Sequence, residues 1–176
     1  MTVLQVDSLQ FTFSPLVAAQ IYDTWQHYVA IWNRSGGQKA VDMVAIESPA
    51  APTTTWLIEA KDFRVITNPP KSSNVAGLAQ TVADKAADTL AGLADTAAHA
   101  VVASEKNHAM NALVAPAKRV VLHLEPHTGT YSALFPAGFP ASVYQKLKQL
   151  VKSIDPNPLV LNIANTPTAG VPWIVA

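Results

Sequence analysis

Two apolar segments with a loop between them constrain the fold of this 176-residue chain more than any other feature. The segments cover residues 40–44 and 56–63, and both are rich in apolar, β-branched or aromatic side chains and end in charge, as buried strands do. The loop of residues 47–55 contains Pro49, Pro52 and three threonines, so it continues neither strand. The sequence therefore predicts a β-hairpin about this loop.

The centre of the loop sets the register of the hairpin, in which paired residue numbers sum to 101. Val44 is then opposite Leu57, and Asp42 is opposite Glu59. Because side chains alternate across a strand, Glu59 and Lys61 are predicted on one face of the hairpin with Asp42 beside them. Two carboxylates and an ammonium group at the end of an apolar hairpin are costly unless they have a use.

The chemistry of these three residues indicates a metal site. Two carboxylates at close range repel each other, and a hard divalent cation such as Mg²⁺ or Mn²⁺ relieves the repulsion. Such a cation polarises a phosphoryl oxygen and acidifies a coordinated water, while a neighbouring lysine orients that water or stabilises charge in the transition state. Asp42, Glu59 and Lys61 therefore predict metal-assisted phosphoryl chemistry.

The pattern of an Asp followed 17 residues later by Glu59-Ala60-Lys61 resembles the PD-(D/E)XK nuclease superfamily, which has the restriction-endonuclease-like fold. The first element reads Val41-Asp42, so the proline of the family motif is absent. The resemblance implies that Asp42, Glu59 and the backbone carbonyl of Ala60 bind the metal and that Lys61 assists the attacking water. It also implies hydrolysis of phosphodiester bonds in DNA.

The same resemblance suggests three accessory residues. The first helix of the superfamily sometimes supplies an extra acid, and Asp23 is the only acid in the corresponding segment. The helix after the Glu-X-Lys strand contributes a Gln or a Lys in several branches, which makes Gln80 the candidate, with Lys85 behind it. Arg64 follows the strand, where a phosphate could bind, although an ion pair with Asp62 is an equal alternative. For Asp23 and Gln80 the alternative is a solvent-facing position on a helix.

The remaining segments complete an α/β pattern. The predicted elements are a strand at 9–13, a helix at 16–32, a long helix at 75–101, a strand at 119–124, a helix from 140 and a strand at 159–163. We expect one domain over residues 1–176, with a central mixed β-sheet flanked by helices in a restriction-endonuclease-like arrangement. Its core would cover about residues 9–125, followed by a C-terminal helix–strand extension over residues 126–176.

Composition bears on location and partners. The chain contains no cysteine, which excludes disulfides and thiolate zinc sites but leaves an oxygen-ligand metal site open. No basic segment precedes an apolar one at the N-terminus, and charges interrupt the alanine-rich middle, so we expect a cytoplasmic protein without membrane contact. The 12 basic and 12 acidic residues balance, whereas nucleic-acid binders usually carry a basic excess. Affinity for DNA would therefore depend on a homodimer or on a protein partner.

Two alternatives to a nuclease stay open. A non-catalytic interaction module could retain the nuclease fold within a larger assembly; the neutral charge favours it, and the intact set of Asp, Glu and Lys argues against it. In an ordinary α/β domain, Glu59 and Lys61 would instead be a chance ion pair. The carboxylates of Asp42 and Glu59 would then point to opposite faces of the sheet.

Overall fold

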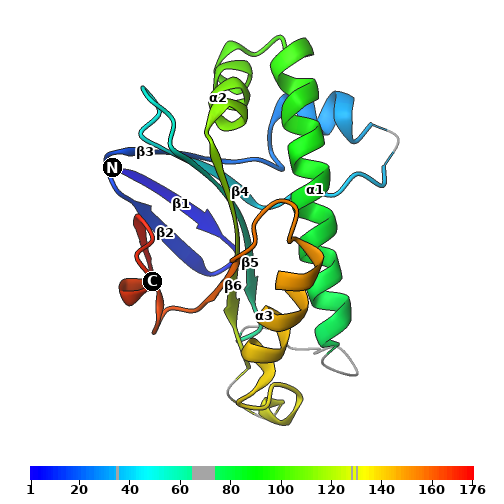
Figure 1. Ribbon diagram of the computed structural model, residues 1–176, viewed down its shortest axis with the longest axis vertical. Coiled ribbons are helices and arrows are strands. Elements are labelled where there is room, and N and C mark those ends of the chain that lie inside the picture. Colours follow the sequence, from blue (N-terminus) through cyan, green and yellow to red (C-terminus); the bar gives the residue numbers. More distant parts are fainter. Residues whose placement is uncertain (35, 65–73, 128, 130) are drawn as a thin grey trace.

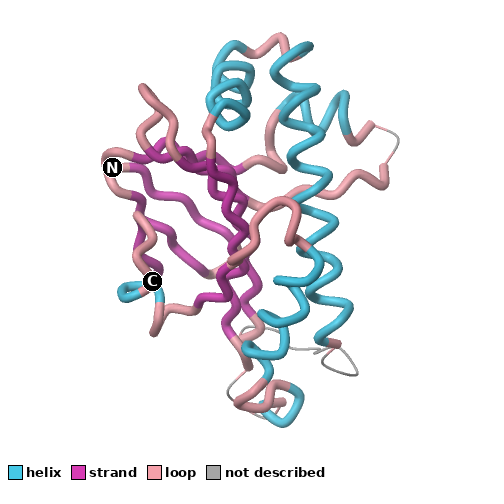
Figure 2. Tube along the Cα trace, viewed as in Figure 1, coloured by secondary structure: helices cyan, strands magenta, loops and turns pink. Residues whose placement is uncertain are grey.

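Two β-sheets and a layer of helices build the protein (Figures 1 and 2). The structure is a computed structural model that describes residues 1–34, 36–64, 74–127, 129 and 131–176. The smaller sheet is antiparallel and has the order β1 (Thr2–Val6), β2 (Leu9–Phe13), β8 (Trp173–Val175). The larger sheet has the order β3 (Val17–Ile21), β4 (Met43–Glu47), β5 (Thr54–Asp62), β6 (Ala117–Glu125), β7 (Leu159–Leu161).

The larger sheet is mixed. β3, β4 and β5 pair antiparallel, whereas β5, β6 and β7 pair parallel. The helices are α1 (Val75–His99), α2 (Ala103–Val114) and α3 (Phe139–Leu150), with short helical turns η1 (Tyr28–Trp32), η2 (Ser132–Leu134) and η3 (Thr166–Thr168). Figure 1 shows α1 and α3 on one side of the large sheet and β1 and β2 on the other. The prediction of an α/β protein with a central mixed sheet flanked by helices is confirmed.

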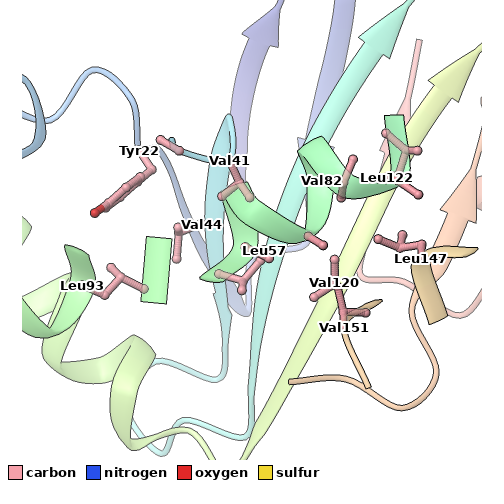
Figure 3. Close-up of a cluster of buried hydrophobic side chains, with 14 of the residues drawn as sticks. Tyr22, Val41, Val44, Leu57, Val82, Leu93, Val120, Leu122, Leu147 and Val151 are labelled. Atoms are coloured by element: carbon pink, nitrogen blue, oxygen red, sulfur yellow. The ribbon is translucent and has the colours of Figure 1, made fainter. Parts of the chain in front are cut away.

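Both faces of the large sheet are buried, because the helices cover one face and the small sheet covers the other. Val44 and Leu57 belong to the core under the helices, which Figure 3 shows together with Val82 of α1 and Leu147 of α3. Their neighbours along the two strands face the small sheet instead, namely Met43, Ala45, Trp56 and Ile58. These side chains form a second core with Phe11, Phe13 and Trp173 of the small sheet. Burial on both faces explains why these strands read as continuous apolar runs.

The predicted register of the β4–β5 hairpin is confirmed. Met43 pairs with Ile58 and Val44 with Leu57, so the paired residue numbers sum to 101 as expected. The predicted strand at 9–13 is β2, and the long helix, the buried strand that follows it, the second helix and the last strand correspond to α1, β6, α3 and β7. α1 ends at His99, and a second helix, α2, begins at Ala103 and packs against α1 and β4.

The predicted helix over residues 16–32 is wrong. Residues 17–21 form β3, which pairs with β4 along its whole length, from Val17 opposite Glu47 to Ile21 opposite Met43. The only helical part of this segment in the described chain is a short turn around η1. Of the aromatic residues at helical spacing, Trp25 and Tyr28 are buried and Trp32 is partly buried, but they reach the core from a loop and a short turn. Pairing with β4 outweighed the local helical pattern, which is a weak determinant by itself.

No helix in the described ranges combines the length and the apolar character needed to span a lipid bilayer.

Candidate active site

Asp42 and Glu59 meet where β5 extends beyond β4. The pairing of the two strands stops at Met43 and Ile58, one residue before Glu59. Beyond that point the backbone N–H of Ala60 donates a hydrogen bond to Asp42 Oδ2 at 2.7 Å. The Asp42 side chain thus takes the place of the next ladder partner, and this bond fixes it next to Glu59.

The Glu59 carboxylate contacts two ammonium groups. Glu59 is 0% exposed, Lys61 Nζ lies 2.6 Å from its Oε1, and Lys85 Nζ donates to Oε1 and Oε2 at 2.7 and 2.8 Å. Alternation along β5 directs Leu57, Glu59 and Lys61 to the helix-covered face, where α1 supplies Lys85. Lys85 Nζ also lies 3.5 Å from Asp42 Oδ1. The two carboxylates therefore do not diverge to opposite faces, since both contact the same ammonium group.

The combined effect of burial and the neighbouring charges raises the pKa values of both Glu59 and Lys61. Burial, and secondarily the Asp42 carboxylate, raise the pKa of Glu59 despite the two lysines. Burial alone would lower the pKa of Lys61, but Glu59 and Asp42 together raise it. Lys61 is therefore an ammonium group at neutral pH, suited to orienting a water or stabilising negative charge and unsuited to removing a proton.

An open cleft of about 340 Å³ lies beside this cluster. Asp42, Ala60 and Lys61 line it, together with Asp23 after β3 and Asp7 in the β1–β2 turn. The Lys61 side chain is 31% exposed, whereas Glu59 is fully buried behind it. A ligand in the cleft would meet Asp42 and Lys61 directly.

The accessory candidates divide into one inside the site and two outside it. Asp23 lines the cleft; its side chain is exposed, yet crowding by protein atoms and then the Asp42 carboxylate raise its pKa. Gln80 is exposed on α1 and donates to Asp84 Oδ1 at 2.7 Å. Arg64 forms an ion pair with Asp62, with Nη2 2.8 Å from Oδ2. The structure thus places Asp23 at the cleft that Asp42 and Lys61 line, and it places Gln80 and Arg64 in other contacts.

Lys85, rather than Gln80, is the residue that α1 contributes to the site. It follows buried Val82 by three residues and precedes buried Thr89 by four, so it lies on the helix stripe that faces the sheet. The sequence feature that indicates this role is a lysine at a position that the helical spacing places on the buried stripe. Its side chain is 19% exposed, which leaves Glu59 and Asp42 as its principal neighbours.

The oxygen donors of the site fit a divalent cation. The Lys85 ammonium stands between the two carboxylates, so the position between Asp42 and Glu59 already holds a positive charge. The N–H and C=O of one residue in a strand point to the same side, so the Ala60 carbonyl is directed to the edge where its N–H meets Asp42. Such hard oxygen donors suit Mg²⁺ and Mn²⁺. No group of three or more acidic or His side chains surrounds a single point among the residues with described positions, so the protein would supply two carboxylates and one carbonyl.

Among known proteins, the chain is similar to part of a longer protein. No protein-family model matches the chain, and no solved structure matches it. A cysteine–tRNA ligase of Neisseria meningitidis serogroup A / serotype 4A is 25% identical over 213 aligned residues, which cover 100% of this chain and 30% of the ligase. The chain therefore spans less than a third of the length of this relative. Similarity at this level does not assign the chain to a family.

Proposed function

We propose that this protein is a Mg²⁺- or Mn²⁺-dependent phosphodiester hydrolase of the PD-(D/E)XK type that acts on DNA. The observation that carries the proposal is the convergence of Asp42, Glu59 and Lys61 beside one cleft, which Asp42, Lys61 and Ala60 line and behind which Glu59 is buried. These are the residue types and the spacing that the superfamily uses for metal binding and for activation of water.

The order of the elements supports the same proposal. β3, β4 and β5 form an antiparallel meander, α1 follows, and β6 returns parallel to β5. The superfamily core consists of a helix, two or three strands, a helix and a strand, which agrees with this chain from β3 onward. The strands β1 and β2 precede the meander where the superfamily has its leading helix. A restriction-endonuclease-like fold is therefore part of the proposal.

Each residue of the site has a separate role in the proposed reaction. A divalent cation held by Asp42, Glu59 and the Ala60 carbonyl would polarise the phosphate and acidify a water. The hydrogen bond from Ala60 N–H fixes the orientation of the Asp42 carboxylate before substrate arrives. Lys61, protonated and exposed at the cleft, orients the attacking water and stabilises the charge that develops on the phosphate.

The proposal includes a source of additional affinity for DNA. The 12 basic and 12 acidic residues give a net charge of zero, so the single chain offers little general attraction for phosphates. A homodimer or a partner protein would supply further phosphate contacts. The cytoplasmic location expected from the sequence stays a prediction.

One observation favours a second candidate, a non-catalytic interaction module within a larger assembly. The two carboxylates and two ammonium groups of the site have a formal charge of zero, so the cluster is electrostatically balanced without a metal. In this alternative the ion pairs only attach α1 to the sheet. The similarity to 30% of a longer chain, a cysteine–tRNA ligase, agrees with a module that lies beside other domains.

Cleavage of DNA distinguishes the two candidates. We would incubate the protein with supercoiled plasmid and with single-stranded DNA, in Mg²⁺, in Mn²⁺ or in a chelator. We expect metal-dependent cleavage by the wild type and a loss of at least about 100-fold in Asp42→Asn and in Lys61→Met. Lys39→Met is the matched control, because Lys39 forms an exposed ion pair with Asp84 of α1 outside the site. Absence of cleavage on both substrates, with the protein folded, would favour the interaction module.

A further inference from the structure

The position between the Asp42 and Glu59 carboxylates is filled by a side chain of the protein itself. Lys85 Nζ lies 2.7 Å from Glu59 Oε1, 2.8 Å from Oε2 and 3.5 Å from Asp42 Oδ1. This is the place that a cation shared by the two carboxylates would take. An ammonium group and a divalent ion cannot occupy it together.

The contacts at Glu59 show which oxygen depends on Lys85. Oε1 is shared by Lys61 and Lys85, whereas the contact described for Oε2 is the one with Lys85. Departure of Lys85 would free Oε2 and one face of Asp42 for a new ligand. Lys61 would stay on Oε1 and keep the carboxylate oriented.

Charge reinforces the steric argument. Asp42 and Glu59 supply two negative charges, and Lys61 and Lys85 supply two positive charges, so the cluster is neutral as it stands. A divalent ion that entered with Lys85 still present would meet two ammonium groups at close range. When Lys85 leaves, one negative charge becomes available to the incoming ion.

We propose that Lys85 is an internal cation that competes with the divalent metal for Asp42 and Glu59. The protein without DNA then binds Mg²⁺ or Mn²⁺ weakly. A DNA phosphate at the cleft offers the Lys85 ammonium another anionic partner, so DNA and metal bind with positive cooperativity. The inference rests on the proposed function, and it adds a control on when the site acquires its metal.

Removal of the ammonium group tests the competition directly. We would titrate Mn²⁺ into DNA-free wild type, Lys85→Met and the control Lys39→Met by calorimetry. Lys85→Met is expected to bind Mn²⁺ at least about 10-fold more tightly than the wild type. Lys39→Met, which also removes one positive charge next to α1, is expected to bind like the wild type. A duplex with a cleavage-resistant backbone is expected to raise the Mn²⁺ affinity of the wild type and to change that of Lys85→Met much less.

The outcomes separate this inference from the function on which it rests. Equal Mn²⁺ affinity in wild type and Lys85→Met, with binding present in both, overturns the competition and leaves the metal site intact. If Mn²⁺ binds to no variant, with or without the duplex, the metal site itself is refuted and the inference falls with it. Thermal unfolding checks that each variant is folded. Lys85→Gln, which keeps a polar side chain, replaces Lys85→Met if the latter does not fold.

Discussion

Protonation of His108 is expected to destabilise the protein at mildly acidic pH. His108 lies on α2, is 5% exposed, and contacts the carbonyl oxygen of Val44 through Nε2 at 3.1 Å. Its ring packs edge-on against Trp25, with the ring centroids 5.5 Å apart. Burial lowers the pKa of His108 from 6.5 to about 4, and the hydrogen bond to Val44 offsets only part of this effect.

The direction and size of the pH effect follow from this shift. The unfolded chain takes up a proton on His108 near pH 6.5, whereas the folded protein resists protonation until about pH 4. The contribution to the free energy of unfolding is therefore complete above pH 6.5 and decreases as the pH falls through this window. With about 1.4 kcal/mol for each pKa unit, the loss is about 2 kcal/mol at pH 5 and about 3 kcal/mol at pH 4.

Urea unfolding of wild type and His108→Gln at several pH values measures this contribution. Gln retains an N–H donor for Val44 but does not titrate, so the difference between the two proteins isolates His108. We expect the free energy of unfolding of the wild type to fall relative to that of the variant by about 2 kcal/mol between pH 7 and pH 5. Parallel curves over this range would refute the assignment of His108 as a buried neutral residue.

Two further substitutions test the packing and the acid stability of the fold. Gly92→Ala on α1 would place a Cβ in overlap with the Tyr22 hydroxyl. Overpacking destabilises the folded state by about 1–3 kcal/mol, which exceeds the gain in helix propensity of about 1 kcal/mol. Thermal unfolding should therefore show a lower melting temperature for the variant. Asp62→Asn removes a carboxylate whose pKa is lowered to about 2 by Arg64 and, to a lesser extent, by Ser8. In the wild type this carboxylate contributes about 2 kcal/mol to the free energy of unfolding above pH 3.8, and the contribution is lost as the pH falls through about 2. Urea unfolding should therefore show a less stable variant at pH 7 and equal stabilities near pH 2.

The hairpin could be predicted from the sequence because several local signals agreed. Two apolar runs flank a loop that contains Pro49 and Pro52, and one register places both carboxylates on the same face. The structure has this register. The proximity of Asp42 to Glu59 follows from it, because the Ala60 N–H beyond the last strand pair binds the Asp42 side chain.

The features that could not be predicted depend on contacts between distant segments. Residues 17–21 have helical spacing in their apolar side chains, and only pairing with β4 makes them a strand. The choice between Gln80 and Lys85 was equally non-local, since both lie on the same helix and the rotation of α1 against β5 decides which one reaches Glu59. Position on the buried stripe of the helix selects Lys85, whereas distance from the start of the helix selects Gln80. The first criterion identifies the residue that contacts Glu59.

Metal binding in the presence of DNA tests the central claim most directly, namely that Asp42 and Glu59 form one metal site beside Lys61. We would titrate Mn²⁺ by calorimetry into the protein bound to a cleavage-resistant duplex, for the wild type, Asp42→Ala and Glu59→Ala. The account predicts binding to the wild type that disappears in both variants. Absence of binding to the wild type, or binding that survives both substitutions, would contradict it.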